Sequence, residues 1–109
     1  MSILQHSKGA TFNYVFDIPD TIGNGFFRKW KATAQIRKAN NNLPSGMIAQ
    51  LQCYWTNEST TKQLVLSHDL TDNWPVGLAE FDVLFESVDG QSMRSSIMPV
   101  QIVRGVTQR

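Results

Sequence analysis

The sequence is poor in the residues that metal sites, disulfide scaffolds and nucleic-acid-binding surfaces require. It has 109 residues, with one cysteine, two histidines and a formal net charge of +1. Cys53 alone cannot close an intrachain disulfide, and one cysteine with His6 and His68 is too few ligands for a zinc site. A near-neutral charge is also unlike that of a dedicated nucleic-acid-binding domain. We therefore expect no metal, no cofactor and no nucleic-acid partner.

Long apolar runs and helical periodicity are missing as well. The N-terminal segment MSILQHSKGATF has no basic stretch followed by a sustained apolar run, which argues against a signal peptide and a membrane span. No stretch of ten or more residues repeats apolar positions with the period of a helix. A chain of this length that is 41% hydrophobic predicts one domain over residues 1–109, with loose tails at 1–8 and 104–109.

Charged residues make up only 17% of the chain, against roughly 25% in average soluble proteins. The loops are accordingly built largely from Asn, Ser, Thr, Gln and Gly. Such a surface suits contact with other proteins. Cys53 lies within an apolar strand pattern, where a free cysteine is expected to be inert core.

Apolar residues recur at every second position in several short segments, which is the spacing of half-buried β-strands. The pair Asp89-Gly90 predicts a tight hairpin turn, and Pro99 indicates a sheet edge or a bulge. Thr71 is placed to cap a single helical turn near residues 71–74. The expected strands cover residues 10–16, 27–37, 47–56, 62–67, 78–86 and 92–103, the last as one long strand or two short ones.

Six or seven short strands separated by turn clusters favour an all-β fold, a sandwich of antiparallel sheets. The alternation also predicts which side chains fill its interior. The expected core residues are Phe12, Tyr14, Trp30, Ile36, Leu51, Trp55, Phe81, Val83 and Phe85.

No arrangement of residues points to catalysis. His6 and His68 belong to no recognisable motif, and both are expected to be solvated. Asp69 follows His68 directly, but adjacent residues of a strand point to opposite faces. Asp17 and Asp20 share a turn that could hold calcium, although a plain structural turn is the favoured interpretation. We expect no catalytic residues and a protein that is not an enzyme.

The basic run Arg28–Lys31 surrounds Trp30 and superficially resembles a nucleic-acid platform. Period two turns Trp30 inward, and the acidic residues of segment 78–86 offer cross-strand partners for the cations. Trp74, beside Pro75, is interpreted either as a seal at one end of the sandwich or as a contact anchor. The expected contact residues are Trp74, Asn40, Asn41, Asn42, Arg28, Lys29 and Lys31.

The order of motifs resembles small bacteriophage tail, neck and fibre-associated proteins and the N-terminal modules of baseplate and tail-fibre proteins. The motifs run over about residues 8–107, whereas the segment DIPDTIGNG and the pair Phe26-Phe27 depart from the pattern. The resemblance implies an immunoglobulin-like β-sandwich of about seven strands with no catalytic residues to carry over. The matching pieces are Lys8–Phe12, Lys31–Arg37, Leu64–Leu66, Leu70-Thr71 with Pro75–Gly77, Phe81–Val83, Asp89-Gly90, Pro99–Val103 and Val106-Thr107.

The function we expect is that of a non-enzymatic virion structural or docking protein. Its partners would be other virion proteins and further copies of itself, as a trimer or a hexamer-type ring, with no membrane partner. It would be made in the cytoplasm of the bacterial host and act in the virion. The alternative is a carbohydrate-binding module for host-surface recognition, which predicts an exposed aromatic shelf that includes Trp74 and Tyr54.

Overall fold

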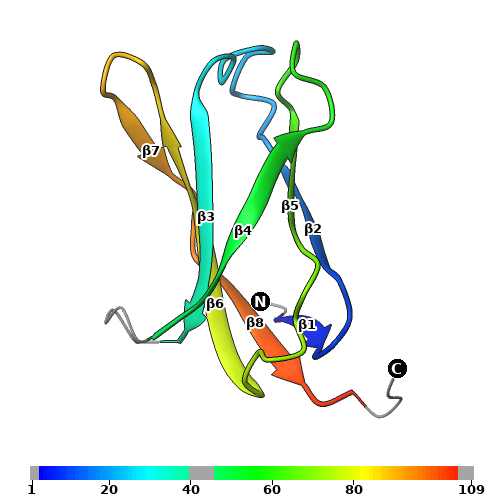
Figure 1. The fold of residues 1–109 in the computed structure, drawn as a ribbon. Coiled ribbons are helices and arrows are strands. Elements are labelled where there is room, and N and C mark those ends of the chain that lie inside the picture. Colours follow the sequence, from blue (N-terminus) through cyan, green and yellow to red (C-terminus); the bar gives the residue numbers. More distant parts are fainter. Residues whose placement is uncertain (1–2, 40–45, 106–109) are drawn as a thin grey trace.

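The computed structural model describes residues 3–39 and 46–105, and this part of the chain contains eight strands and no α-helix (Figure 1). The expected all-β fold is confirmed. The strands are β1 (Leu4–Ser7), β2 (Phe12–Asp17), β3 (Lys31–Lys38), β4 (Met47–Trp55), β5 (Gln63–His68), β6 (Gly77–Glu86), β7 (Ser92–Arg94) and β8 (Met98–Val103).

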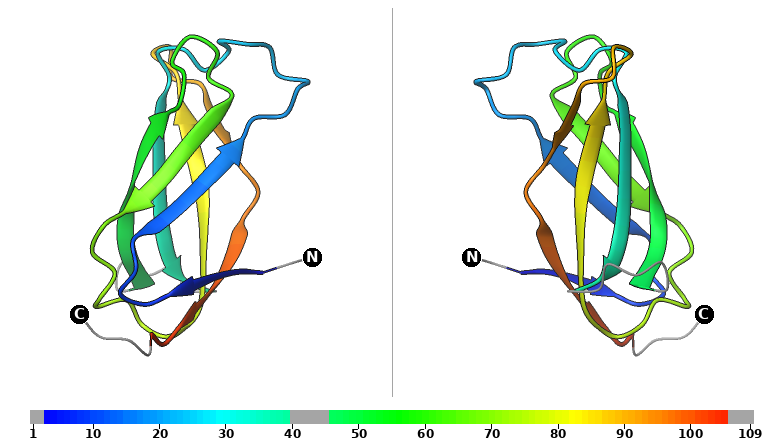
Figure 2. Two further views of the ribbon diagram at one scale, coloured as in Figure 1. Left: turned by 90° about the vertical axis from the view of Figure 1, so that its right-hand side faces the viewer. Right: turned by 90° about the vertical axis from the view of Figure 1, so that its left-hand side faces the viewer.

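The strands form one continuous sheet in the order β1-β8-β6-β3-β4-β5-β2, with β7 beside the second half of β6. β4 connects the two halves of the sandwich, because Met47–Leu51 pairs with β3 whereas Gln52–Trp55 pairs with β5. All pairings are antiparallel except the parallel pairing of β1 with β8. The sheet thereby bends into a barrel-like sandwich with β2 and β5 on one side (Figure 2).

The interior is filled by alternate side chains of the strands, as the period of two predicts. In β6, Ala79, Phe81, Val83 and Phe85 are all buried. Six of the expected core residues are buried, and the other three are half-buried and pack against the core. The buried six are Phe12, Ile36, Leu51, Phe81, Val83 and Phe85, and the half-buried three are Tyr14, Trp30 and Trp55.

The N-terminal segment differs from the loose tail expected over residues 1–8. Leu4–Ser7 forms β1 and runs parallel to β8, with Leu4 opposite Val100. The backbone N–H of Lys8 continues this pairing by donating to Val103 O at 2.8 Å. This pairing also buries His6. Of the expected C-terminal tail, residues 106–109 lie outside the described part of the chain.

The helical turn expected near residues 71–74 is not formed. Trp74 N donates to Thr71 O at 3.1 Å, which closes a single turn without a helix. The Thr71 hydroxyl does not cap this turn, since it donates instead to Ala10 O at 2.5 Å. The prediction was wrong because a distant backbone partner competes for the side chain that would have capped the helix.

The hairpin predicted at Asp89-Gly90 joins β6 to β7. Ser87 N donates to Gln91 O at 2.9 Å, and Gly90 N donates to Ser87 O at 3.2 Å. Of the two predicted turn residues, Gly90 alone has positive φ, at 91°. The loop is therefore a three-residue turn closed by a glycine bulge, in place of a two-residue turn.

The segment 92–103 forms two short strands, β7 and β8, which was one of the two expected alternatives. Pro99 lies in β8 opposite Glu80, and the pairing of β8 with β1 begins only at Val100. Pro99 thus lies just before the part of β8 that has a neighbouring strand on both sides. Its missing N–H therefore removes no hydrogen bond from the sheet.

Candidate functional site

The expected contact residues do not form one surface. Arg28 and Lys29 are exposed in the loop before β3, and Lys31 is exposed at the start of that strand. Trp74 belongs to the loop before β6. That loop lies at the opposite end of the molecule from the loop before β3 (Figure 1). The remaining three expected contact residues, Asn40, Asn41 and Asn42, lie outside the described residues.

The basic residues of β3 face the acidic strand β6, as the cross-strand interpretation predicted. Lys31 is opposite Glu86, and Arg37 is opposite Glu80. Opposite charges in such positions stabilise a sheet by a few tenths of a kcal/mol per pair. Trp30 precedes the strand and is half-buried against the core. The run Arg28–Lys31 therefore lacks the exposed aromatic ring that a base-stacking platform needs.

Trp74 is only 3% exposed, so the expectation that it serves as a contact anchor was wrong. Its ring lies 5.2 Å from that of His6, 5.5 Å from that of Phe12 and 5.7 Å from that of His68, between ring centroids. We call these four residues the Trp74 cluster. Burying this ring removes a large apolar area from water, which is the sealing role that the sequence left open. Trp74 therefore cannot belong to the exposed aromatic shelf that the carbohydrate hypothesis requires.

His6 is buried in the Trp74 cluster, whereas the sequence predicted a solvated histidine. Its ring packs edge-on against Phe12 at 5.2 Å. Burial lowers the pKa of His6, and a hydrogen bond with the backbone of Ala10 opposes this only in part. Only the pairing of β1 with β8 brings His6 into the interior, so nothing local to MSILQHS indicated it.

His6 and Thr71 form a histidine–hydroxyl pair that sequence reasoning missed. His6 Nε2 lies 3.4 Å from Thr71 Oγ1. The hydroxyl also accepts from Gly9 N at 2.9 Å and donates to Ala10 O, and Thr71 is fully buried. A nucleophile must reach a substrate, and this hydroxyl is shielded and committed to the backbone. The pair holds the β1–β2 corner against the loop before β6.

A second aromatic group closes the other end of the core. Phe27 stacks on Phe85 with ring centroids 4.3 Å apart, and it lies 6.1 Å from Trp55 and 5.3 Å from Trp30. Phe26, which is partly exposed, packs on Phe27 at 5.0 Å. We call these five residues the Phe27 cluster. The pair Phe26-Phe27 is thus structural, in a segment where the sequence offered no strand pattern.

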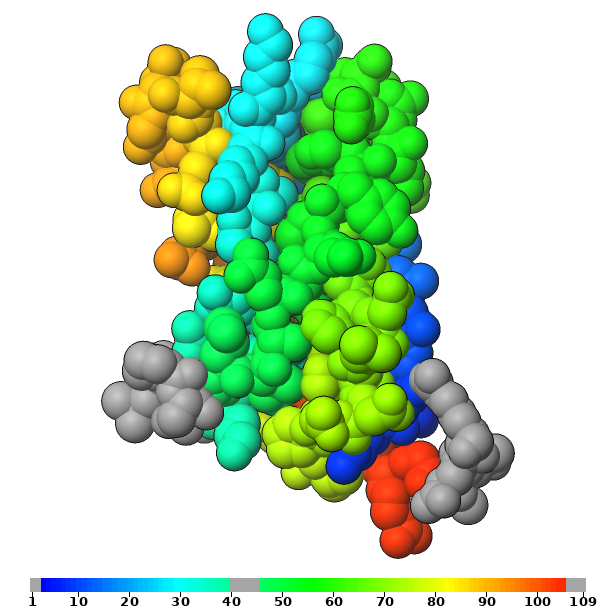
Figure 3. Space-filling model, viewed as in Figure 1, coloured from blue at the N-terminus to red at the C-terminus, as the bar shows by residue number. Residues whose placement is uncertain are grey.

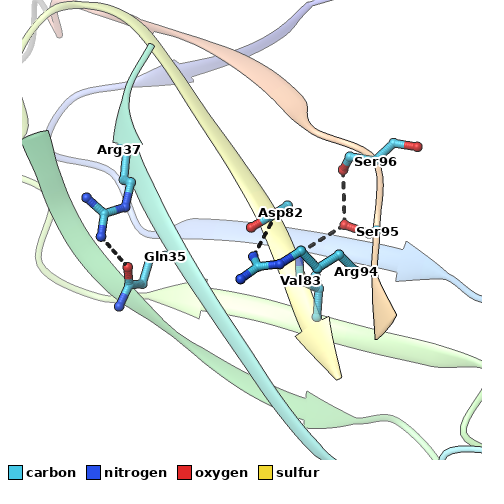
Figure 4. A network of polar contacts seen from close by, with 7 residues as sticks. All are labelled: Gln35, Arg37, Asp82, Val83, Arg94, Ser95 and Ser96. Atoms are coloured by element: carbon cyan, nitrogen blue, oxygen red, sulfur yellow. Dashed lines mark hydrogen bonds and ion pairs between the residues drawn. The ribbon is translucent and has the colours of Figure 1, made fainter. Parts of the chain in front are cut away.

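The outer face of β3 and β6 carries a shallow polar hollow of about 380 Å³. Arg94 of β7 donates to Asp82 of β6 at 3.3 Å, and Arg37 donates to Gln35 at 2.9 Å (Figure 4). The Ser95 hydroxyl accepts from Val83 N at 2.9 Å at the rim of this network. Arg94 and Asp82 thus form an ion pair at this hollow, whereas the Gln35 partner of Arg37 is a neutral amide.

The remaining chemical candidates do not come together. Asp17 accepts a hydrogen bond from Gln63 at 3.4 Å, and no group of three or more His, Cys, Asp or Glu residues converges within the described ranges. Burial raises the pKa of the Cys53 thiol, which favours its protonated form. In the part of the chain that the structure covers, no helix is long and apolar enough to cross a membrane.

The sheet ends in β2, which is paired on one side only. β2 is hydrogen-bonded to β5, and no other described strand lies beside it (Figure 2). In the space-filling view, the blue N-terminal residues lie at the right-hand margin of the molecule, beside the yellow-green residues (Figure 3). Directly after the strand, Ile18 N donates to Lys62 O at 2.8 Å in the same register. Hydrogen-bonded pairs alternate along an antiparallel ladder, so the even-numbered residues of β2 bond to β5.

The odd-numbered residues Asn13, Val15 and Asp17 therefore direct their backbone N–H and C=O groups away from the sheet. Their side chains are exposed on the outer face, and Val15 is 48% exposed. Val15 lies opposite Val65 of β5, which in turn lies opposite Tyr54 of β4, itself 53% exposed. A row of apolar side chains thus crosses this half of the sheet and ends at the open edge.

The sequence matches no protein-family model, and a search of curated proteins finds no match. The candidate site therefore rests on the geometry of the chain itself. Among the described residues, the open edge of β2 is the surface with the largest set of outward backbone groups in a regular strand.

Proposed function

We propose that the protein is a non-enzymatic structural or docking module that works through protein–protein contacts. The observation that carries this proposal is the open edge of β2, with outward backbone groups at Asn13, Val15 and Asp17. Extended edges of this kind add a strand from a neighbouring chain, because main-chain hydrogen bonds supply affinity. The low charge of the surface and its exposed apolar side chains agree with such a role.

The setting we propose is a bacteriophage virion, in the tail, neck or fibre-attachment region. The support is the order of motifs from Lys8 to Thr107, which resembles small phage proteins of that kind. Partners are then other virion proteins and further copies of this chain. A ring of three or six copies stays a prediction, as does synthesis in the cytoplasm of the bacterial host.

Two measurements test the virion assignment. The gene is expected among phage or prophage genes for tail, neck or fibre components. Mass spectrometry of density-gradient-purified particles from that phage is expected to find the chain in fixed stoichiometry with the tail proteins. A gene among metabolic enzymes, or purified particles that lack the chain, would overturn the assignment.

The carbohydrate alternative requires an exposed shelf of aromatic rings, and the structure lacks most of it in the described residues. Trp74 is buried. Tyr54 is exposed, but its neighbours across β5 and β2 are Val65 and Val15, neither of which carries a ring. A glycan array that shows binding abolished by Tyr54→Ala would reinstate this alternative.

A further inference from the structure

We propose that β2 pairs antiparallel with β2 of a second copy of this chain, across a two-fold axis at Val15. The two sheets then continue into one another through the dimer. This inference deepens the proposed docking function and rests on it for its setting. Its geometry is derived only from the register and the side chains of β2.

The backbone groups of β2 fit this pairing. Asn13, Val15 and Asp17 are evenly spaced, and all three direct N–H and C=O outward. With Val15 opposite Val15 of the second copy, Asn13 stands opposite Asp17 of the second copy, and Asp17 opposite its Asn13. Every outward group within the strand then gains a partner in a regular ladder.

The outer face of the pairing is complementary in chemistry. The Asn13 side chain presents an amide donor to the Asp17 carboxylate across the axis, at both symmetric positions. The two Val15 side chains meet at the axis and join the rows formed by Tyr54, Val65 and Val15 in each copy. A two-fold register centred on Asp17 would instead bring two carboxylates together, and one centred on Asn13 would place Asp17 opposite Gly9, outside β2, so the axis at Val15 is favoured.

The inner face is complementary as well. Tyr14 and Phe16 point toward the core but remain only half-buried, because no strand covers them beyond the edge. In the proposed register Tyr14 stands opposite Phe16 of the second copy. These are non-hydrogen-bonded pairs, in which the side chains approach most closely, and cross-strand aromatic pairs are among the most stabilising.

β2 also lacks the features that keep edge strands from pairing. Its sequence, FNYVFD, contains no lysine, no proline and no glycine. The other described edges are shorter, with four residues in β1 and three in β7. The edge of β2 is therefore the strand of this chain that is best suited to a second copy.

The oligomeric state of the full chain is the first test. Sedimentation equilibrium is expected to give a monomer–dimer equilibrium with the mass of two chains at saturation. A monomer up to millimolar concentration would overturn the two-fold pairing. A trimer or hexamer without a dimeric intermediate would overturn it too, because a head-to-tail ring does not place Val15 opposite itself.

Charge changes on the exposed face of β2 test the register. Asn13→Asp places two carboxylates opposite each other at both symmetric positions and is expected to raise the dimer Kd about tenfold. The double variant Asn13→Asp with Asp17→Asn reverses the original pair and is expected to restore the Kd to within about twofold. A double variant that dimerises as weakly as Asn13→Asp would overturn the register.

Gln50→Glu is the matched control for these variants. Gln50 is exposed on β4, where the strand pairs with β3, and the change also converts one amide to one carboxylate. Its dimer Kd is expected to equal that of the unchanged chain. If Gln50→Glu weakened the dimer as much as Asn13→Asp does, the effect would come from net charge and the proposed register would be overturned. These results are separable from the virion assignment, because a monomeric chain found in purified particles would leave that assignment standing.

Discussion

The two ends of the core are closed by different chemistry. The Phe27 cluster consists of aromatic rings alone, packed face-to-face or edge-on at centroid distances of 4.3 to 6.1 Å around Phe27. The Trp74 cluster instead holds two imidazoles and sits on the buried hydroxyl of Thr71. The first end depends on apolar area and packing, whereas the second also depends on hydrogen bonds and on the charge state of a histidine. Conditions that change protonation should therefore act on one end only.

The largest expected effect is at the apolar end. Phe27→Ala should lower the free energy of unfolding by about 3–5 kcal/mol, because it removes a buried ring and leaves a cavity beside Phe85. Urea denaturation followed by tryptophan fluorescence measures the change. Phe26→Ala is the control, and its partly exposed ring should cost clearly less. Equal costs for the two variants would mean that Phe27 does not close this end.

Thr71→Val tests the polar end at nearly constant side-chain volume. The variant removes the hydroxyl that bonds the half-buried N–H of Gly9 and the C=O of Ala10, which should cost about 1–3 kcal/mol. Urea denaturation gives the total, and hydrogen exchange should show lost protection at Gly9 with little change at Phe85. Thr71→Ser keeps the hydroxyl and should recover most of the stability. A Thr71→Val protein as stable as the unchanged chain would contradict the role of this hydroxyl.

The sequence predicted the regions in which neighbours along the chain decide the structure. In β3 and β6 the alternation of Ala34, Ile36, Phe81 and Val83 is strict, and the register places all four inside. The reversal at Gly90 was also predictable, because a residue with positive φ at that point favours glycine. The local sequence was sufficient in both cases.

The Trp74 cluster could not be predicted in this way, because it is assembled by long-range pairing. His6 is buried only because β1 lies beside β8, whose sequence is more than ninety residues away. Thr71 turns toward Ala10 for the same reason. The open edge at Val15 likewise follows from the order of the strands, which no single segment encodes. Sequence patterns gave the inward positions but not which strand would be left without a neighbour.

The pH dependence of stability separates the two ends further. The pKa of His6 is lower in the folded protein than the 6.5 of an unperturbed histidine, because burial disfavours the charged ring. Below about pH 6.5 the unfolded chain therefore binds more protons than the folded one, and stability should fall as the pH decreases toward the folded pKa. The effect should be smaller than that of Thr71→Val. Urea denaturation between pH 7.5 and 5.5, a range chosen around that value, measures it.

His6→Gln is the control for this pH dependence. Glutamine does not titrate, so the variant should lose much of the slope of stability against pH in that range, whatever its stability at pH 7.5. Phe27→Ala should keep the slope of the unchanged chain, because the Phe27 cluster contains no titratable group. A slope that survives His6→Gln would show that the pH response originates outside the Trp74 cluster.

The smallest expected effect lies on the flank between the ends, at the ion pair of Arg94 and Asp82. The two side chains are 3.3 Å apart, and that of Arg94 is 63% exposed. Solvent and salt screen such a pair, so Arg94→Ala should change stability by no more than about 0.5 kcal/mol in urea denaturation. A cost equal to that of Thr71→Val would mean that surface charge holds the sheet as strongly as the buried hydroxyl does. In that case the two clusters at the ends of the core would not be the main source of stability. A small cost for Arg94→Ala would instead leave the Phe27 cluster and the Trp74 cluster as the main determinants of stability.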